Sequence, residues 1–266
     1  MPHFDGRGFR IHYVEEGSGP AVVFAHGAAA DHTMYAAQFE DLPDRYRCIA
    51  WDMRGHGRSA MPDAPWTMQD IVVDLIAFIE GVNAAPCHLV GHSIAANAAL
   101  RLAIQREDLL RSLVLIGANA AAEDGGTKEL LRTFVAEVER NGGASEDQAS
   151  AIASFQFADA FRAERADAVE VFANGVGKMS GEAIAAVLNC AIDRDPLVDR
   201  LGEVRVPTLV IHGDEDAIPV ARGDEIAEGI GSAESVRVPG AGHMPPLEAP
   251  DVVNEALAGF FARVKR

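Results

Sequence analysis

An apolar run that ends in a Gly-x-Ser-x-Ala pattern constrains this chain more than any other stretch. Residues 87–90 form the run, Gly91, Ser93 and Ala95 form the pattern, and an Ala-rich segment of helical character follows. A strand that turns directly into a helix holds the residue at the turn in a strained backbone conformation, which only small neighbours permit. The Ser93 hydroxyl is then held clear of the sheet, beside the free N–H groups of the helix N-terminus. We therefore interpret Ser93 as a nucleophile.

The composition of the chain limits its class. Hydrophobic residues make up 48% of its 266 positions, enough for the core of one large domain or two small ones. No apolar run approaches the ~18 residues that a membrane span requires, and the N-terminus lacks the pattern of an export leader. The net charge of −17 argues against nucleic acid and anionic membranes as partners. Cys48 and Cys87 lie in apolar, strand-like runs, as buried free thiols do, so we expect a cytoplasmic protein.

Strand-like runs and helical patterns alternate along most of the chain. Helical spacing is clearest at residues 67–82, where Thr67 and Asp70 resemble an N-terminal cap. This alternation predicts a mostly parallel sheet covered by helices on both faces. The expected elements are a hairpin at 4–15, strands at 21–25, 47–51, 87–90, 112–116, 208–212 and 235–238, and further helices near 34–42, 94–106, 221–230 and 250–264.

Residues 119–200 break this alternation, because they contain no strand-like run. Their pattern is that of several amphipathic helices separated by breaks rich in glycine and proline. A structureless loop of this length would be unusual in a globular domain. We therefore predict a helical insertion at residues 119–200, within a core domain formed by residues 1–118 and 201–266.

Four stretches give the chain a resemblance to the α/β-hydrolase superfamily along nearly its whole length. They are His26-Gly27 after the third strand, Asp52-x-Arg54-Gly55-x-Gly57-x-Ser59 after the fourth, the turn at residues 91–95, and Gly213-Asp214-Glu215-Asp216-x-x-Pro219 with Gly242-His243 near the end. The resemblance implies an α/β fold with an N-terminal antiparallel hairpin, in which residues 119–200 form a lid after the sixth strand. Small carboxylesterases and enol-lactone hydrolases are the most similar members. Many relatives have two glycines where this chain has Ala95-Ala96, so we expect a tighter turn that still supports activity.

A serine hydroxyl needs a base within hydrogen-bond reach to act as a nucleophile at neutral pH. The resemblance places this base at His243, in the loop after the last strand. Different positions are expected for seven other histidines: His88 packed inside its strand, His92 on the strand face opposite Ser93, His26 and His56 bracing glycine-rich loops, and His3, His12 and His32 with no strand end beside them.

The base needs an acid to orient it, and the loop after residues 208–212 offers three acidic residues at positions 214–216. The family pattern Gly-Asp-x-Asp-x-x-Pro favours the second aspartate, so the resemblance assigns the acid to Asp216. We expect Asp214 to form a turn or a helix cap instead. Some relatives supply the acid after the sixth strand, but here Glu123 and Asp124 do not stand at the strand end.

A developing oxyanion needs two aimed donors, which are typically backbone N–H groups. The position directly after the nucleophile assigns one donor to Ile94. The position after His26-Gly27 assigns the other to Ala28. Three phenylalanines of the insertion are candidates for substrate contacts, with packing between lid and sheet as the alternative for all three: Phe155, Phe157 and Phe161.

These residues together predict a cofactor-free serine hydrolase that cleaves a small carboxylic ester or lactone through an acyl-enzyme. No cluster of Cys and His has metal-ligand spacing, and the glycines at residues 52–59 lack the spacing of a phosphate-binding loop. We therefore expect neither a metal nor another cofactor. Two alternatives stay open: carbon–carbon bond hydrolysis of a diketone-like substrate on the same triad, and a ligand receptor that uses the lid as a switch.

Overall fold

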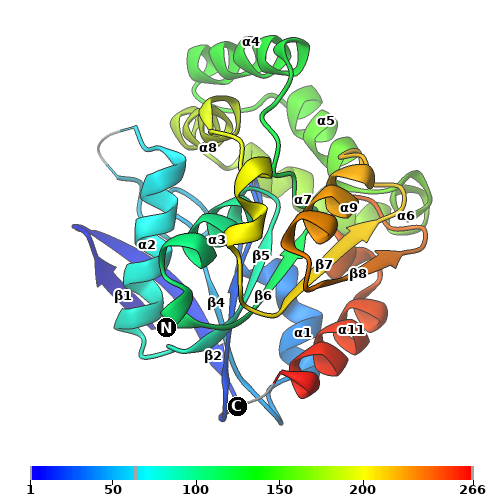
Figure 1. Ribbon diagram of the computed structural model, residues 1–266. Helices are drawn as coiled ribbons and strands as arrows, with labels where there is room; N and C mark the ends of the chain where they lie inside the picture. The colour runs from blue at the N-terminus through cyan, green and yellow to red at the C-terminus, as the bar shows by residue number, and fades with distance from the viewer. Residues whose placement is uncertain (1, 63–64, 265–266) are drawn as a thin grey trace.

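Eight strands form one sheet in the computed structural model, which describes residues 2–62 and 65–264 (Figure 1). Along the sheet they follow the order β1-β2-β4-β3-β5-β6-β7-β8. β1 pairs with β2 and β2 with β4 in antiparallel fashion, and every later pairing is parallel. The mostly parallel sheet with an N-terminal hairpin is therefore confirmed. The strands are β1 (His3–Gly6), β2 (Phe9–Glu16), β3 (Ala21–Ala25), β4 (Arg47–Trp51), β5 (Cys87–His92), β6 (Leu110–Ile116), β7 (Thr208–Gly213) and β8 (Ala233–Val238).

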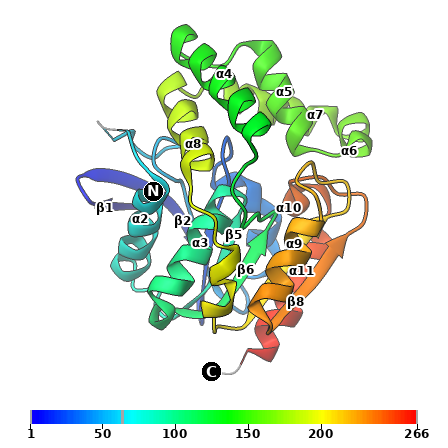
Figure 2. The same cartoon turned by 45° about the horizontal axis from the view of Figure 1, so that its top comes forward.

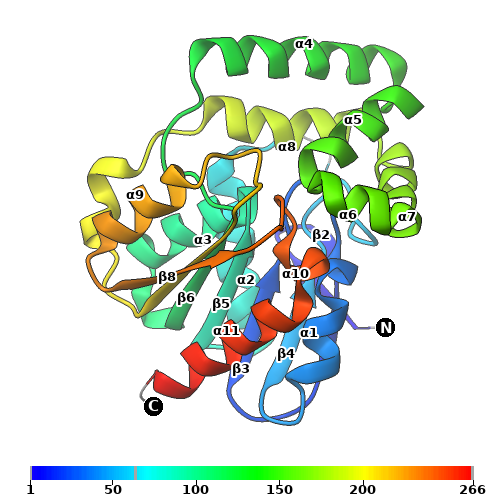
Figure 3. The same cartoon turned by 90° about the vertical axis from the view of Figure 1, so that its right-hand side faces the viewer.

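Helices cover both faces of the sheet, as Figures 1 and 3 show. The helices α2 (Met68–Gly81), α3 (Ile94–Gln105) and α9 (Ala221–Ile230) pack into one hydrophobic cluster, whereas α1 (Ala36–Asp41) and α11 (Pro250–Arg263) pack into a second one. Along β3, Val23 faces the first cluster, and Val22 and Phe24 face the second. Alternate side chains of this buried strand therefore supply both cores. The shorter helical turns are η1 (His32–Tyr35), η2 (Glu107–Leu109), η3 (Val198–Glu203) and α10 (Pro245–Glu248).

Local signals in the sequence account for several helix boundaries. Thr67 and Asp70 form the expected capping box at the start of α2, since each side chain accepts the backbone N–H of the other residue. The single helix expected near residues 34–42 is wrong in its first part. There Asp31 caps the 3₁₀ turn η1, and α1 begins only at Ala36.

The three cysteines of the chain, Cys48, Cys87 and Cys190, are buried free thiols. Burial raises the pKa of each thiol to about 12. They therefore remain protonated and behave as small apolar side chains at neutral pH.

Five helices between β6 and β7 form a layer beyond the ends of the parallel strands (Figures 2 and 3). In this layer α8 packs on the core through Ala186, Val187 and Cys190, and α4 packs on α8 and lies outermost. Within the described residues, no helix has the length and apolar character needed to cross a membrane. The five helices are α4 (Gly125–Asn141), α5 (Glu146–Gln156), α6 (Asp159–Glu164), α7 (Ala166–Gly177) and α8 (Gly181–Asp193).

Candidate active site

The chain turns sharply between β5 and α3, and Ser93 stands at this turn. Its backbone has φ 53° and ψ −116°, a strained conformation for a residue with a side chain. Gly91 permits the turn, because a Cβ there would lie 2.8 Å from the carbonyl oxygen of Ala95 and 2.8 Å from Cα of Ala96. The N–H of Ser93 donates to the carbonyl of Ile116 on β6 at 2.8 Å, which fixes the turn against the sheet.

The structure brings Ser93, His243 and Asp216 together from three separate loops. Ser93 Oγ lies 2.9 Å from His243 Nε2, and His243 Nδ1 lies 2.9 and 3.0 Å from the two carboxylate oxygens of Asp216. Gly117 at the end of β6 has φ 57°, and a Cβ there would lie 2.8 Å from His243 Cε1, so the imidazole needs a glycine beside it. A neutral imidazole in this place can accept the serine proton at Nε2 while its Nδ1–H donates to the carboxylate.

Asp216 is held in its ionised form. Burial on its own would raise the pKa of Asp216, but the imidazoles of His212 and His243 and the N–H of Ile218 favour the charged carboxylate and lower the pKa below its usual range. The N–H of Ile218 donates to Oδ1 at 2.8 Å, whereas His212 Nδ1 lies 3.7 Å from Oδ2, too far for a hydrogen bond. An ionised Asp216 can stabilise the imidazolium that forms when His243 takes a proton.

The neighbouring acidic residues have contacts of their own. Asp214 is exposed, and its carboxylate accepts the N–H of Gly240 at 2.6 Å, in the turn role expected for it. After β6, Glu123 pairs with Arg194 at 2.5 Å and Asp124 caps the start of α4. Turn, ion-pair and cap contacts therefore account for these three acids.

Two backbone segments border Ser93, and they contain the two residues expected as oxyanion donors. Ile94 is the first residue of α3, where the N–H has no acceptor within the helix. On the other side Gly27 approaches so closely that a Cβ there would lie 3.0 Å from Cβ of Ser93. Ala28 follows in the same loop and is partly exposed. Ile94 and Ala28, both expected as donors, therefore lie in the two segments that border the serine.

Two buried histidines hold the loops around this site. His26 Nδ1 bonds to the carbonyl of Gly27 at 2.8 Å, and its Nε2 accepts the N–H of Met53 at 2.8 Å. His92 is the last residue of β5 and is fully buried. Its Nε2–H donates to the carbonyl of His243 at 2.7 Å, and the two ring centroids are 4.8 Å apart.

Burial lowers the pKa of His92 to about 3, so its imidazole is neutral at ordinary pH. It cannot add positive charge beside His243. Its contact with the His243 carbonyl serves to position the loop that carries the base.

Glu248 belongs to the site, although the sequence analysis did not identify it. Its carboxylate accepts the N–H groups of Ala158 at 2.8 Å, Gly242 at 3.0 Å and Met244 at 3.0 Å. Gly242 and Met244 flank His243, and Ala158 belongs to the helical layer. Burial raises the pKa of Glu248, although the three N–H groups oppose that shift. An acidic residue five positions after the histidine is the sequence signal that could have indicated this role.

The three phenylalanines considered for substrate contacts occupy two different environments. The rings of His243 and of Phe155 on α5 meet edge-on, with their centroids 5.4 Å apart. Phe155 is 47% exposed to solvent. Phe157 is buried, stacks on Phe161 at 5.2 Å and meets Phe172 edge-on at 5.3 Å. Phe155 therefore borders the triad, while Phe157 and Phe161 pack in the second hydrophobic cluster.

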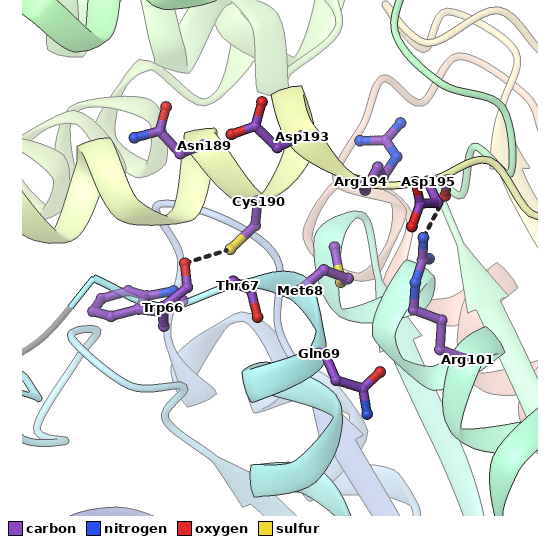
Figure 4. Close-up of a pocket in the computed structure, with 10 residues that line it drawn as sticks. All are labelled: Trp66, Thr67, Met68, Gln69, Arg101, Asn189, Cys190, Asp193, Arg194 and Asp195. Carbon is purple, nitrogen blue, oxygen red and sulfur yellow. Dashed lines mark hydrogen bonds between the residues drawn. The ribbon is translucent and has the colours of Figure 1, made fainter.

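A separate pocket of about 240 Å³ lies between α8 and the first residues of α2, with Arg101 of α3 along one side (Figure 4). The thiol of Cys190 donates to the carbonyl of Trp66 at 3.6 Å, and Arg101 donates to the carbonyl of Asp195. None of the residues that line this pocket belongs to the triad. It is therefore distinct from the candidate active site.

Residues 22–256 match the model of the alpha/beta hydrolase family, and the chain belongs to this family of hydrolases. A protein of Mycobacterium tuberculosis with the provisional name non-heme bromoperoxidase BpoC is 30% identical, over 95% of this chain and 98% of its own. The 3-oxoadipate enol-lactonase 1 of Acinetobacter baylyi is 25% identical, over 92% of this chain and 90% of its own. A solved structure of a thermophilic esterase from Thermogutta terrifontis matches with a TM-score of 0.91 and 27% identity, over 97% of this chain and 95% of its own.

Proposed function

We propose that this hydrolase cleaves a small carboxylic ester or lactone through a covalent acyl-enzyme on Ser93. The observation that carries the proposal is the hydrogen-bonded line from Ser93 Oγ through His243 to Asp216, with donor–acceptor distances of 2.9 Å. A hydroxyl, a neutral imidazole and a buried carboxylate in this order are the parts of serine-based acyl transfer.

The first half of the reaction forms the acyl-enzyme. Ser93 Oγ attacks the carbonyl carbon while His243 Nε2 takes the hydroxyl proton. When the tetrahedral intermediate collapses, the bond to the leaving oxygen breaks and His243 returns the proton to that oxygen. An ester releases its alcohol at this point, whereas a lactone opens and keeps its hydroxyl on the acyl chain. Asp216 stays ionised and stabilises the imidazolium.

The second half hydrolyses this intermediate. His243 takes a proton from water as the water oxygen attacks the acyl carbon, and the proton passes to Ser93 Oγ as the acid leaves. In both halves the oxyanion would accept hydrogen bonds from the N–H groups of Ile94 and Ala28. Preorganised donors of this kind supply a large part of the rate enhancement in acyl transfer.

We propose a neutral or weakly polar substrate. Positions 119–200 hold eight basic and fifteen acidic residues, a net charge of −7. A strongly anionic ester would therefore meet no excess of positive charge in the helical layer. The names of an enol-lactonase and an esterase among the similar proteins support an oxygen ester as the scissile group.

Residues 119–200 are proposed to act as the lid of this site. Within this segment, α6 has no buried residue and α7 has one. Few apolar contacts therefore hold these two helices in place. Phe155 brings one aromatic ring of this layer to the triad. We infer that the layer selects the acyl or alcohol group, while the sheet carries the chemistry.

Rapid-mixing kinetics with activated p-nitrophenyl esters of increasing acyl length test the proposed function. We expect a burst of nitrophenol close to one equivalent per active site, followed by a slower steady state, because acyl-enzyme accumulates. Ser93→Ala is the matched control and should show neither phase. Thermal stabilisation by esters without turnover would support a receptor instead. Cleavage of a diketone with no ester turnover would support carbon–carbon hydrolysis.

A further inference from the structure

Three side chains that are far apart in the sequence converge beside β4. His12 lies on β2, His32 opens the turn η1, and Asp52 follows β4. His12 Nδ1 is 3.0 Å from Asp52 Oδ2, and His32 Nδ1 is 2.8 Å from Asp52 Oδ1. The ligand atoms of all three groups lie within 4.8 Å of one another. The catalytic serine, base and acid are not members of this cluster.

The carboxylate at the centre of this cluster is held in a fixed orientation. The backbone N–H of His32 donates to Oδ1 at 2.8 Å, and the N–H of Arg58 donates to Oδ2 at 2.8 Å. Gly57 leaves room for the carboxylate, because a Cβ there would lie 2.4 Å from Asp52 Cγ. Each oxygen of Asp52 therefore keeps a backbone donor when an imidazole proton is withdrawn. Such outer contacts orient a carboxylate ligand toward a metal.

We propose that His12, His32 and Asp52 form a binding site for one divalent cation of the Zn²⁺ class. Two imidazole nitrogens and one carboxylate are ligands of the type that Zn²⁺ prefers, at about 2.0–2.2 Å from the metal. The cation would take the place of the two protons that now lie between Nδ1 and the carboxylate. Each imidazole would bind the cation in its neutral form through Nδ1 and carry its proton on Nε2 instead.

His12 makes one hydrogen bond through Nδ1, to Asp52, and its buried Nε2 has no partner. The exchange of tautomer at His12 therefore breaks no other bond, and the metal–nitrogen bond has to offset the cost of a buried N–H without an acceptor. His26 differs, since both of its nitrogens have backbone partners that fix its tautomer. His12 is thus available as a ligand in a way that His26 is not.

Access and charge also suit a cation. His12 and Asp52 are buried, but the His32 side chain is 13% exposed and gives the cluster a face toward solvent. Rotation of the partly exposed His32 imidazole can bring its Nδ1 nearer to Nδ1 of His12. This is needed because both nitrogens must reach the same metal ion. The whole chain carries a net charge of −17, which favours the approach of a cation.

No spacing in the sequence indicates this cluster, because its members stand at positions 12, 32 and 52 and meet only in the folded sheet. His3 lies directly opposite His12 on β1, with ring centroids 5.8 Å apart, but it is outside the group of converging ligand atoms. Its exposed imidazole provides a matched control for binding at a neighbouring histidine.

Untagged protein, freed of metal with a chelator, would be titrated with Co²⁺ and with Zn²⁺. We expect one equivalent of Co²⁺ to bind and to give the visible absorption bands of Co²⁺ with a low coordination number. Zn²⁺ should displace it. His32→Gln and Asp52→Asn should weaken binding at least tenfold, whereas His3→Ala should bind as the wild-type protein does. Circular dichroism checks the fold of each variant, and His32→Gln remains decisive if Asp52→Asn fails to fold. Absence of a stoichiometric site, or unchanged binding in folded His32→Gln, would overturn the proposal.

Discussion

The helices α3 and α7 have the same length but very different surroundings. Ten of the twelve residues of α3 are buried, against one of the twelve residues of α7. α3 starts at the turn that holds Ser93 and is packed on the sheet, whereas α7 belongs to the helical layer above it. Ser93 therefore rests on densely packed structure, while the helical layer that is proposed to meet the substrate is held by few apolar contacts.

The two regions are nevertheless joined at one place. The carboxylate of Glu248 accepts N–H groups from the histidine loop and from Ala158. The N–H of His243 in turn donates to the carbonyl of Gln156 at 2.9 Å. A change in the helical layer can therefore reach the base through the backbone. Substitutions in the two regions should separate chemistry from selectivity, except at this junction.

The largest difference is expected between two aspartates of one loop. Asp216→Asn favours the wrong tautomer of His243 and should lower kcat by about 10³–10⁴, as in the triad template. Asp214→Asn removes only a turn contact to Gly240 and should cost less than tenfold. Steady-state kinetics on one activated ester measures both variants. If the two effects are reversed, the acid is wrongly assigned.

A smaller effect on the rate is expected at Glu248, which joins the helical layer to the loop of His243. Glu248→Gln replaces one carboxylate oxygen by an amide that cannot accept, so at least one buried N–H beside His243 loses its partner. We expect kcat to fall roughly tenfold with little change in KM, because a displaced base lowers the rate more than binding. Glu255→Gln makes the same change of charge on the exposed face of α11 and serves as the control. A change confined to KM would show that Glu248 acts on substrate binding instead.

Substitutions in the helical layer should change the selectivity for the acyl chain, with little loss of rate. Phe155→Ala removes a half-exposed ring beside His243 and should alter the ratio of kcat/KM between long and short acyl esters about three- to tenfold. Phe157→Leu changes a buried ring and should lower the melting temperature without altering that ratio. Equal chain-length profiles for wild type and Phe155→Ala would mean that the Phe155 ring contributes to packing and not to substrate selection.

The smallest effect concerns acid stability. The folded-state pKa of Asp216 is depressed, so its charge stabilises the fold above the unfolded pKa of about 3.9, and this stabilisation is lost as pH falls below that value. The difference in unfolding free energy between wild type and Asp216→Asn should therefore narrow between pH 6 and pH 3.5. Urea denaturation at several pH values measures it. A difference that widens toward acid would contradict the sign of this shift.

The order of strands and helices was accessible from the sequence, because buried parallel strands leave continuous apolar runs and helices leave a 3.6-residue period. The turn at Ser93 was accessible because small residues surround it. The contact of His92 with the backbone of His243 was not, since these two residues are 151 positions apart in the chain. The bond of Glu248 to Ala158, and the meeting of His12 with His32 at Asp52, are contacts between distant segments. No local pattern encodes such contacts.

Covalent trapping tests the central claim, that Ser93 is the nucleophile of a serine hydrolase, most directly. The active protein would be treated with a fluorophosphonate, which reacts with activated serines, and its peptides would be mapped by mass spectrometry. We expect one adduct per chain, located on Ser93, in step with the loss of ester hydrolysis. The adduct should be absent in Ser93→Ala and much slower to form in His243→Ala. Complete inactivation with the adduct on another residue, or full activity after Ser93 is modified, would contradict the claim.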